Sequence, residues 1–270
     1  MLSFHGYKPN KHGCNIQWEI SKSIMEINIT DACNLKCPNC QSSCGIAPSK
    51  EMMPLEYIEE FVDDSIRLNW YWEKIKIQGG EPTLHPQLKD IIEIIGRYKS
   101  FQEKALLSST FSLKKCRFYG FTNGTNKIDV PEWFEMMNTR TIETKVWKQF
   151  QTANVAPVDI PEYANLDKTI YRRGCCRMRN CGPGIGCNGL YYPCMTMYHV
   201  DRVFNLGVGV KGLETFLKSD DRKLRDMLEK TCGLCGFFKY PRDIASEQAI
   251  SPTWETAIDK YNSEPPKLFM

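Results

Sequence analysis

The sequence predicts an α/β protein in which a partial barrel of βα units is followed by a small cysteine-rich module. Apolar segments with strand spacing alternate with segments of helical spacing between about residues 24 and 124. This alternation is typical of a parallel sheet or barrel. After Gly174 the composition changes to Cys, Gly and Arg with little periodicity, which indicates a second module organised by metal.

The elements of the barrel follow one another in a regular order. Short alternating runs predict strands at residues 24–30, 74–78 and 117–121. Helical spacing of apolar residues predicts helices at residues 55–66, 88–95 and around 220–230. Between residues 139 and 171 the pattern is too weak to place strands firmly.

Each predicted strand is followed by a loop that carries Cys, Gly or polar residues. These loops cover residues 31–44, 79–83 and 122–124. Ligands gather at the carboxyl ends of parallel strands in folds of this kind. We therefore expect the three loops to meet on one rim of the barrel.

Composition narrows the class of protein. Hydrophobic residues make up 42% and charged residues 25% of the 270 residues, and the formal charge is only +3. Such a charge gives no reason to expect nucleic acid or an anionic membrane as a partner. The N-terminal residues lack the apolar core of a signal peptide, and no apolar run reaches membrane-spanning length. We therefore expect a cytoplasmic protein.

Thirteen cysteines are the strongest signal in the composition. In a reducing compartment they indicate metal ligands or reactive thiols before disulfides. Cys33, Cys37 and Cys40 place three thiolates within eight residues. A four-iron cluster held by three thiolates keeps one iron open for a cofactor or substrate. The alternative is a zinc site or a set of buried thiols, although structural zinc sites usually use Cys-x-x-Cys pairs.

The motif CNLKCPNC resembles the signature of the radical S-adenosylmethionine (radical SAM) superfamily. The sequences GGEP after the second strand and TNG after the third resemble two further landmarks of that family. The resemblance implies a partial (βα) barrel of the radical SAM type, with a catalytic 4Fe-4S cluster on Cys33, Cys37 and Cys40. The family often has an aromatic residue near the adenine before the last cysteine, whereas this chain has Asn39 there.

The same resemblance implies a set of residues that bind S-adenosyl-L-methionine. The backbone of the GGEP turn would hold the methionine amino group, and two glycines allow a close approach of the backbone. The expected cofactor-binding residues are Gly79, Gly80, Glu81, Pro82, Asn39, Thr122 and Asn123.

The second cysteine group is similar to the twitch module, a shortened form of the SPASM auxiliary-cluster domain. The resemblance implies one auxiliary 4Fe-4S cluster with Cys176, Cys194, Cys232 and Cys235 as its ligands, Cys175 being the alternative to Cys176. A zinc ribbon that uses Cys181 or Cys187 is the competing reading. As spare thiols, Cys181 and Cys187 are candidate catalytic hydrogen-atom donors.

These assignments divide the chain into four parts. Residues 1–23 are an N-terminal extension and residues 24–171 the radical SAM partial barrel. The auxiliary-cluster module covers residues 172–240, and residues 241–270 are a C-terminal tail.

The resemblance also implies a reaction. The enzyme would cleave S-adenosylmethionine reductively to a 5′-deoxyadenosyl radical, which abstracts a substrate hydrogen atom. Similarity to twitch-type aminocyclitol dehydrogenases favours a two-electron oxidation of a small polar metabolite, an aminocyclitol or sugar-like alcohol. The auxiliary cluster would accept an electron, and a flavodoxin or ferredoxin would supply the catalytic one. Modification or epimerisation of a ribosomally made peptide is the alternative, and a non-catalytic iron–sulfur or zinc redox protein the third.

Overall fold

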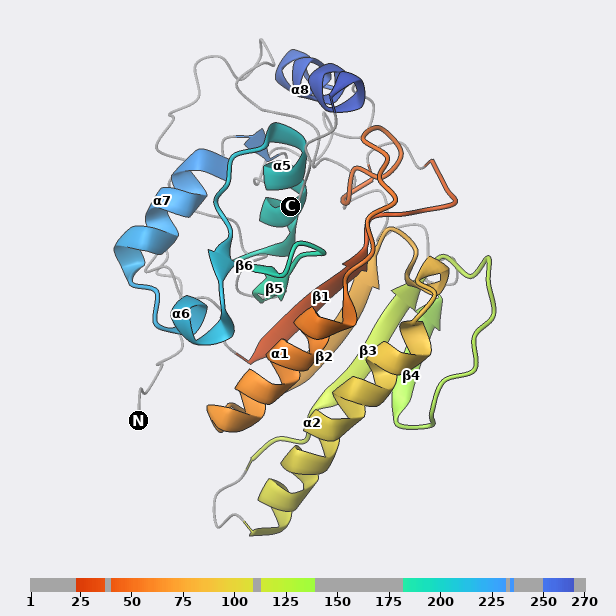
Figure 1. Ribbon diagram of the computed structural model, residues 1–270, viewed down its shortest axis with the longest axis vertical. Helices are drawn as coiled ribbons and strands as arrows, with labels where there is room; N and C mark the ends of the chain where they lie inside the picture. The colour runs from red at the N-terminus through yellow and green to blue at the C-terminus, as the bar shows by residue number, and fades with distance from the viewer. Residues whose placement is uncertain are drawn as a thin grey trace, which may run out of the picture.

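The computed structural model describes residues 23–36, 40–108, 113–138, 182–231, 234–235 and 250–264. Figure 1 shows a sheet with helices packed on it and the long loop after the first strand at one end. The predicted α/β class, with a sheet dominated by parallel strands, is confirmed.

The described strands form one sheet in the order β4-β3-β2-β1-β5-β6-β7. Strands β1 to β4 are parallel to one another, β5 is parallel to β1, and β6 and β7 are antiparallel to their neighbours. The strands are β1 Ile24–Thr30, β2 Lys74–Gly79, β3 Arg117–Thr122, β4 Phe134–Asn138, β5 Gly184–Ile185, β6 Leu190–Tyr192 and β7 Val210–Lys211.

The helices occupy the connections between strands and the C-terminal part of the chain. The described helices are α1 Leu55–Arg67, the single turn η1 Pro82–Leu84, α2 Leu88–Ser108, α5 Met195–Phe204, α6 Leu213–Leu217, α7 Asp221–Thr231 and α8 Pro252–Ser263. The predicted helices correspond to α1, α2 and α7, although α2 continues well past the predicted end. It continues because Tyr98 and Gln102 extend its buried stripe.

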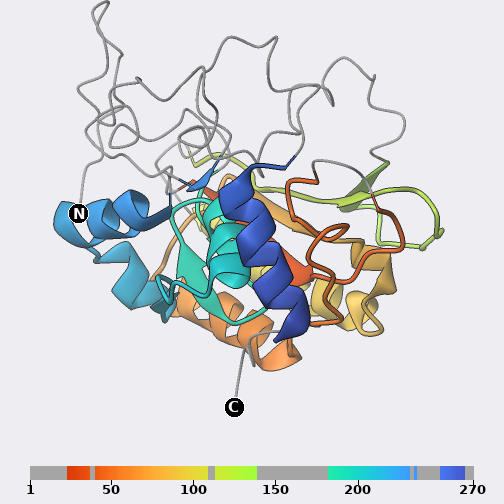
Figure 2. The ribbon, with the colours of Figure 1, turned by 90° about the horizontal axis from the view of Figure 1, so that it is seen from above.

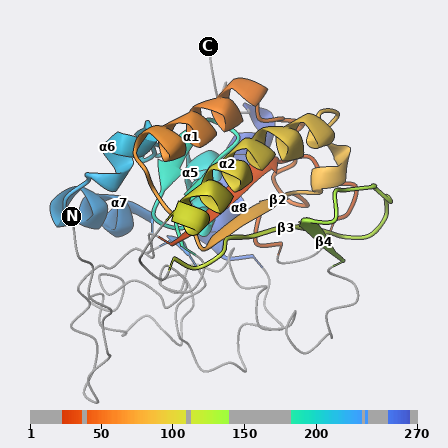
Figure 3. The ribbon, with the colours of Figure 1, turned by 90° about the horizontal axis from the view of Figure 1, so that it is seen from below.

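The core of the N-terminal half lies between the sheet and the pair α1 and α2. Both helices cover the same face of the sheet, as Figures 2 and 3 show from opposite sides. Met25, Ile27 and Ile29 alternate along β1 and are fully buried in this core. A strand has a side-chain period of two, so the residues between them face the other side. Burial of apolar surface on the helix-covered face therefore fixes the register of the central strands.

A second, smaller core joins the C-terminal helices to the loop after β1. Val200 and Val203 of α5 pack with Trp254 of α8, and Ala47 of the loop belongs to the same cluster. The Phe204 and Trp254 rings meet edge to face at 4.9 Å between centroids. Helices from the C-terminal part thus pack directly on the predicted cluster loop.

The sheet is continuous between the N-terminal and C-terminal parts of the chain. Glu26 and Ile27 of β1 pair with Gly184 and Ile185 of β5. The C-terminal strands therefore extend the sheet formed by the N-terminal ones, while the domain limits proposed from the sequence stay predictions. Within the described residues, no helix combines the length and the apolar character needed to cross a membrane.

Candidate functional site

The described residues of the loops after β1, β2 and β3 lie together at the carboxyl ends of the strands (Figure 1). We call the segments 31–44, 79–83 and 122–124 the loop rim. The Gly80 N–H donates to Thr30 O, and the Glu81 N–H donates to Ala32 O, both at 2.8 Å. A Cβ on Gly80 would lie only 2.2 Å from Ala32 O, and one on Gly79 only 2.3 Å from Thr30 O. The two glycines are therefore required because the backbones of two loops touch.

The Glu81 side chain joins the loop after β2 to the loop after β3. Its carboxylate is fully buried. It accepts hydrogen bonds from Thr122 Oγ1 at 2.7 Å and from the Asn123 N–H at 2.6 Å. Thr83 donates to it through its N–H at 3.1 Å and its hydroxyl at 2.6 Å. The side chain and the backbone of Glu81 are therefore both engaged within the protein, and Glu81 acts as a support that joins the loops.

The cysteine loop is tied to the same place by amide side chains. Asn123 Nδ2 donates to Asn34 Oδ1 at 2.8 Å, and Asn34 Nδ2 donates to Thr125 Oγ1 at 2.7 Å. Asn34 directly follows Cys33, so this pair holds the first cysteine of the motif beside the third loop. The structure thus brings together Cys33, Glu81 and Asn123, which are 90 residues apart along the chain at most.

Two of the three predicted cluster ligands are described. Cys33 and Cys40 are partly exposed and lie on the loop after β1. The Leu35 N–H donates to Cys33 Sγ at 3.4 Å. Cys37 and Asn39 lie outside the described residues.

Cys40 has the electrostatic environment of a thiolate. A hydrogen bond from the Cys44 thiol lowers the pKa of Cys40 to about 6, against the opposing effect of burial. The same hydrogen bond, together with burial, raises the pKa of Cys44 well above its ordinary value. At neutral pH Cys40 is therefore ready to bind a metal, since the thiolate is the ligand form.

The donor set fits an iron–sulfur cluster. Cys33 and Cys40 combine partial exposure with hydrogen-bond donors directed at sulfur, which stabilise thiolates bound to such clusters. Across the described ranges no three His, Cys, Asp or Glu side chains gather at metal-binding distances. With Cys37 outside those ranges, the complete ligand set remains a prediction.

The second cysteine group is described only in part. Cys194 is the buried N-cap residue of α5, and Cys235 packs against the α5–α8 core. Cys175, Cys176, Cys181 and Cys232 lie outside the described residues. The auxiliary cluster therefore stays a prediction.

Cys187 is held against β1. Its thiol donates to Asn28 O at 3.0 Å and accepts from Asn28 Nδ2 at 3.2 Å. Burial raises the pKa of the Cys187 thiol well above its usual value, so the sulfur keeps its proton. Its proposed role as a hydrogen-atom donor remains a prediction.

Sequence reasoning missed a row of polar side chains on the face of the sheet opposite α1 and α2. We call Glu26, Asn28, Lys76 and Gln78 the polar sheet face. Lys76 Nζ forms an ion pair with Glu26 Oε1, and Gln78 Nε2 donates to Glu26 Oε2 at 3.1 Å. The signal was present in the alternation of IMEINIT, which places a carboxylate and an amide on the second face of a central strand.

A buried ion pair between distant parts of the chain was likewise not predicted from the sequence. Arg202 of α5 lies 3.6 Å from the Asp31 carboxylate, measured from Nε to Oδ2, and both side chains are fully buried. Asp31 stands two residues before Cys33. No local sequence pattern around Asp31 predicts an ion pair with a residue 171 positions further along the chain.

Comparison with known proteins finds similarity in the N-terminal part of the chain. Residues 27–140 match the model of the Radical SAM superfamily. GTP 3',8-cyclase of Aquifex aeolicus (strain VF5) is 32% identical over 95 residues, which are 34% of this chain and 29% of that protein. GTP 3',8-cyclase of Alkaliphilus metalliredigens (strain QYMF) is 33% identical over 97 residues, or 35% of this chain and 30% of that protein. The chain thus spans less than a third of the length of these relatives.

Two solved structures of another protein cover more of the chain at lower similarity. The crystal structure of BtrN in complex with AdoMet and 2-DOIA shares 13% identity and has a TM-score of 0.45, covering 84% of this chain and 96% of that one. The open conformation of BtrN shares 14% identity and has a TM-score of 0.40, covering 86% of this chain and 96% of that one.

The buried Glu81 carboxylate yields a stability prediction. In Glu81→Gln one acceptor oxygen becomes an NH2 group that faces the N–H or hydroxyl donors of its neighbours. We expect a loss of about 1–3 kcal/mol in the free energy of unfolding, measured by chemical denaturation. Glu135→Gln is the control, because Glu135 forms an exposed ion pair with Arg117 and should change stability by less than about 0.5 kcal/mol. Equal effects of the two substitutions would contradict the assigned role.

Proposed function

We propose that this chain, whose residues 27–140 match the model of the Radical SAM superfamily, is a radical SAM enzyme that oxidises a small polar alcohol by two electrons. The proposed substrate class is an aminocyclitol or a sugar-like alcohol. The polar sheet face beside the loop rim is the observation that carries this proposal.

The polar sheet face has the position that a substrate site requires. Gln78 directly precedes the Gly79-Gly80 turn, and Asn28 lies two residues before the end of β1. Both residues therefore stand just below the loop that carries Cys33 and Cys40. A substrate seated on this face would present its carbon skeleton to a cofactor held at the loop rim.

The chemistry of the polar sheet face suits hydroxyl and amino groups. Glu26 supplies a carboxylate, Lys76 an ammonium and Gln78 an amide, and all three are at least partly buried. Asn28 Oδ1 is buried and has no hydrogen-bond partner among the described residues. A buried acceptor without a partner is costly, and a substrate donor would satisfy it.

Aromatic rings border the polar row. Lys76 Nζ stands 5.1 Å from the centroid of the Phe121 ring, so Phe121 shares this face of the sheet. The Tyr119 and Phe121 rings meet edge to face at 5.7 Å. Rings beside a few fixed polar groups are typical of pockets for small molecules, because the rings cover carbon while the polar groups set orientation.

The residues of the loop rim would hold the cofactors. Cys33, Cys37 and Cys40 would bind a 4Fe-4S cluster, and the backbone of residues 79–82 would face S-adenosylmethionine. When bound, this pair supplies an electron and a carbon-centred radical able to take a hydrogen atom from a C–H bond. The chain contributes surroundings that lower the pKa of the Cys40 thiol and a turn fixed by Glu81.

The oxidation of an alcohol to a ketone needs a second acceptor. The substrate loses one hydrogen atom to the radical, then one proton and one electron. In this proposal the electron goes to an auxiliary 4Fe-4S cluster on Cys194, Cys232, Cys235 and either Cys176 or Cys175. A flavodoxin or ferredoxin is the proposed donor of the first electron.

A second candidate reaction comes from the curated relatives. Those matched over 95 to 97 residues are named GTP 3',8-cyclase, so radical cyclisation of a purine nucleotide is the alternative. The two reactions need different substrates, which makes them separable in one assay.

The first test is the formation of 5′-deoxyadenosine by the anaerobically reconstituted protein with dithionite. We expect the wild type to form it, and aminocyclitols or sugar alcohols to stimulate it more than GTP. Cys33→Ala should abolish the product because the cluster loses one of its three thiolates. Cys116→Ala should retain it, since Cys116 is buried outside the loop rim. Stimulation by GTP alone would favour the cyclisation, and an inactive wild type would exclude radical chemistry.

The second test counts metal in the same reconstituted protein. Two cubane clusters predict about eight irons and no zinc per chain. The double variant Cys232→Ala/Cys235→Ala should lower this to about four irons, whereas Cys116→Ala should leave it unchanged. About four irons with about one zinc in the wild type would contradict the auxiliary cluster and, with it, the proposed electron acceptor.

A further inference from the structure

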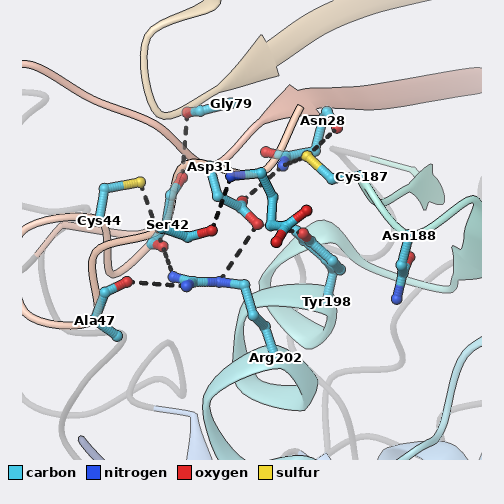
Figure 4. A network of polar contacts seen from close by, with 12 residues as sticks. Asn28, Asp31, Ser42, Cys44, Ala47, Gly79, Cys187, Asn188, Tyr198 and Arg202 are labelled. Atoms are coloured by element: carbon cyan, nitrogen blue, oxygen red, sulfur yellow. Dashed lines mark hydrogen bonds and ion pairs between the residues drawn. The ribbon is translucent and has the colours of Figure 1, made fainter. Parts of the chain in front are cut away.

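We propose that Arg202 is a positioning residue that fastens both ends of the predicted cluster loop to α5 and so sets the geometry of Cys33 and Cys40. Figure 4 shows its guanidinium directed from α5 into the base of this loop. The inference rests on the proposed function only in assigning the cluster to that loop. The clamp itself is a property of the chain without metal.

The guanidinium contacts the loop on both sides of the cysteines. On the N-terminal side it forms the buried ion pair with Asp31. On the C-terminal side Nη2 donates to Ser42 O at 3.0 Å, and Nη1 donates to Ala47 O at 2.9 Å. Asp31 precedes Cys33 by two residues and Ser42 follows Cys40 by two. One planar cation therefore closes the base of the segment that carries all three predicted ligands.

The Asp31 end of the clamp is held independently. The Tyr198 hydroxyl, one turn before Arg202 on α5, donates to Asp31 Oδ2. Asn28 Nδ2 donates to Asp31 Oδ1 at 2.9 Å. These bonds satisfy a carboxylate that is wholly withdrawn from water, which a buried ion pair needs if it is to be tolerated.

Helix α8 also contacts the Arg202 guanidinium. Nη1 also donates to the Tyr261 hydroxyl of α8 at 2.7 Å. Asn262 of α8 donates to Ile46 O at 3.1 Å, so α8 contacts the loop directly as well. The position of the loop is therefore set by two C-terminal helices and not by the barrel strands alone.

The consequence for the cluster follows from this geometry. A cluster held by three thiolates requires their sulfurs in one fixed arrangement, and a loop that moves loses it. Lysine at position 202 would keep the charge, but it has no planar fork to reach Asp31, Ser42 and Ala47 together. Arg202→Lys is therefore expected to loosen the loop while leaving the buried charge compensated.

The test is hydrogen exchange on the metal-free full chain, which needs neither cluster nor activity. The reporters are the amides of Ser43 and Ala47, bonded within the loop to Cys40 O and Ser43 O. In Arg202→Lys we expect these amides to exchange about tenfold faster, with the amides of α1 and α2 unchanged. Tyr71→Phe is the matched control, since it removes one tyrosine hydroxyl, which donates to Asn69 Oδ1 in an exposed hydrogen bond outside the clamp.

Reconstitution provides the second readout. Arg202→Lys should bind less iron at the first cluster and should shift the electron paramagnetic resonance signal of the reduced cluster, whereas Tyr71→Phe should resemble the wild type. Unchanged loop exchange in Arg202→Lys, or a uniform increase over the whole chain, would overturn the clamp. If Arg202→Lys does not fold, Tyr198→Phe replaces it, because it removes the hydrogen bond to Asp31, and the same loop amides are measured.

The two proposals fail in different ways. If the loop loosens but the wild type binds no cluster, the clamp stands and the proposed function falls. If the wild type cleaves S-adenosylmethionine and the loop exchange does not change, the function stands and the clamp falls.

Discussion

The buried carboxylate of Glu81 is the contact on which the geometry of the loop rim depends. It accepts hydrogen bonds from the loops after β2 and β3, while the backbone beside it is bonded to the loop after β1. A side chain has no room at Gly79 or Gly80, so the approach of these backbones is possible only with glycine. The GGE sequence is therefore explained by the packing of three loops, apart from any cofactor.

A second constraint comes from the C-terminal part of the chain. Arg202 of α5 closes the base of the cysteine loop, and Cys194 is the N-cap of the same helix. Eight residues of helix separate the two positions, or about 12 Å along its axis. The proposed ligand of the auxiliary cluster and the clamp of the catalytic loop are thus parts of one rigid element, which relates the two proposed centres through structure.

The parts that were predictable from the sequence are those with local signals. Strands β2 and β3 and helices α1 and α2 bury one face each, and β1 alternates apolar with polar residues, so their periodicity shows in the sequence. Helix α5 is buried on nearly all sides, so its polar residues do not mark a face toward solvent. The strands β5 and β7 have two residues each, too few to show a period, and β5 pairs with the distant β1 as well as with the neighbouring β6. Helix α8 was open to prediction, because Ser251 caps it and Pro252 occupies its first turn.

The same distinction applies to the site. The position of the loop rim was predictable because each of its loops follows a parallel strand. Its cysteines were predictable because they form a recognisable sequence motif. The polar sheet face required reading both faces of a central strand. The pair of Asp31 and Arg202 depends on contacts between residues far apart in the chain, which neither spacing nor composition reveals.

The central claim is that the first three cysteines hold a cluster with one iron open to S-adenosylmethionine. Electron paramagnetic resonance of the reduced protein, recorded before and after adding S-adenosylmethionine, tests it most directly. The account predicts a changed signal, because the cofactor binds the open iron. It also predicts that the change is absent in Cys33→Ala. An unchanged signal in wild-type protein that holds a reduced cluster would contradict the account.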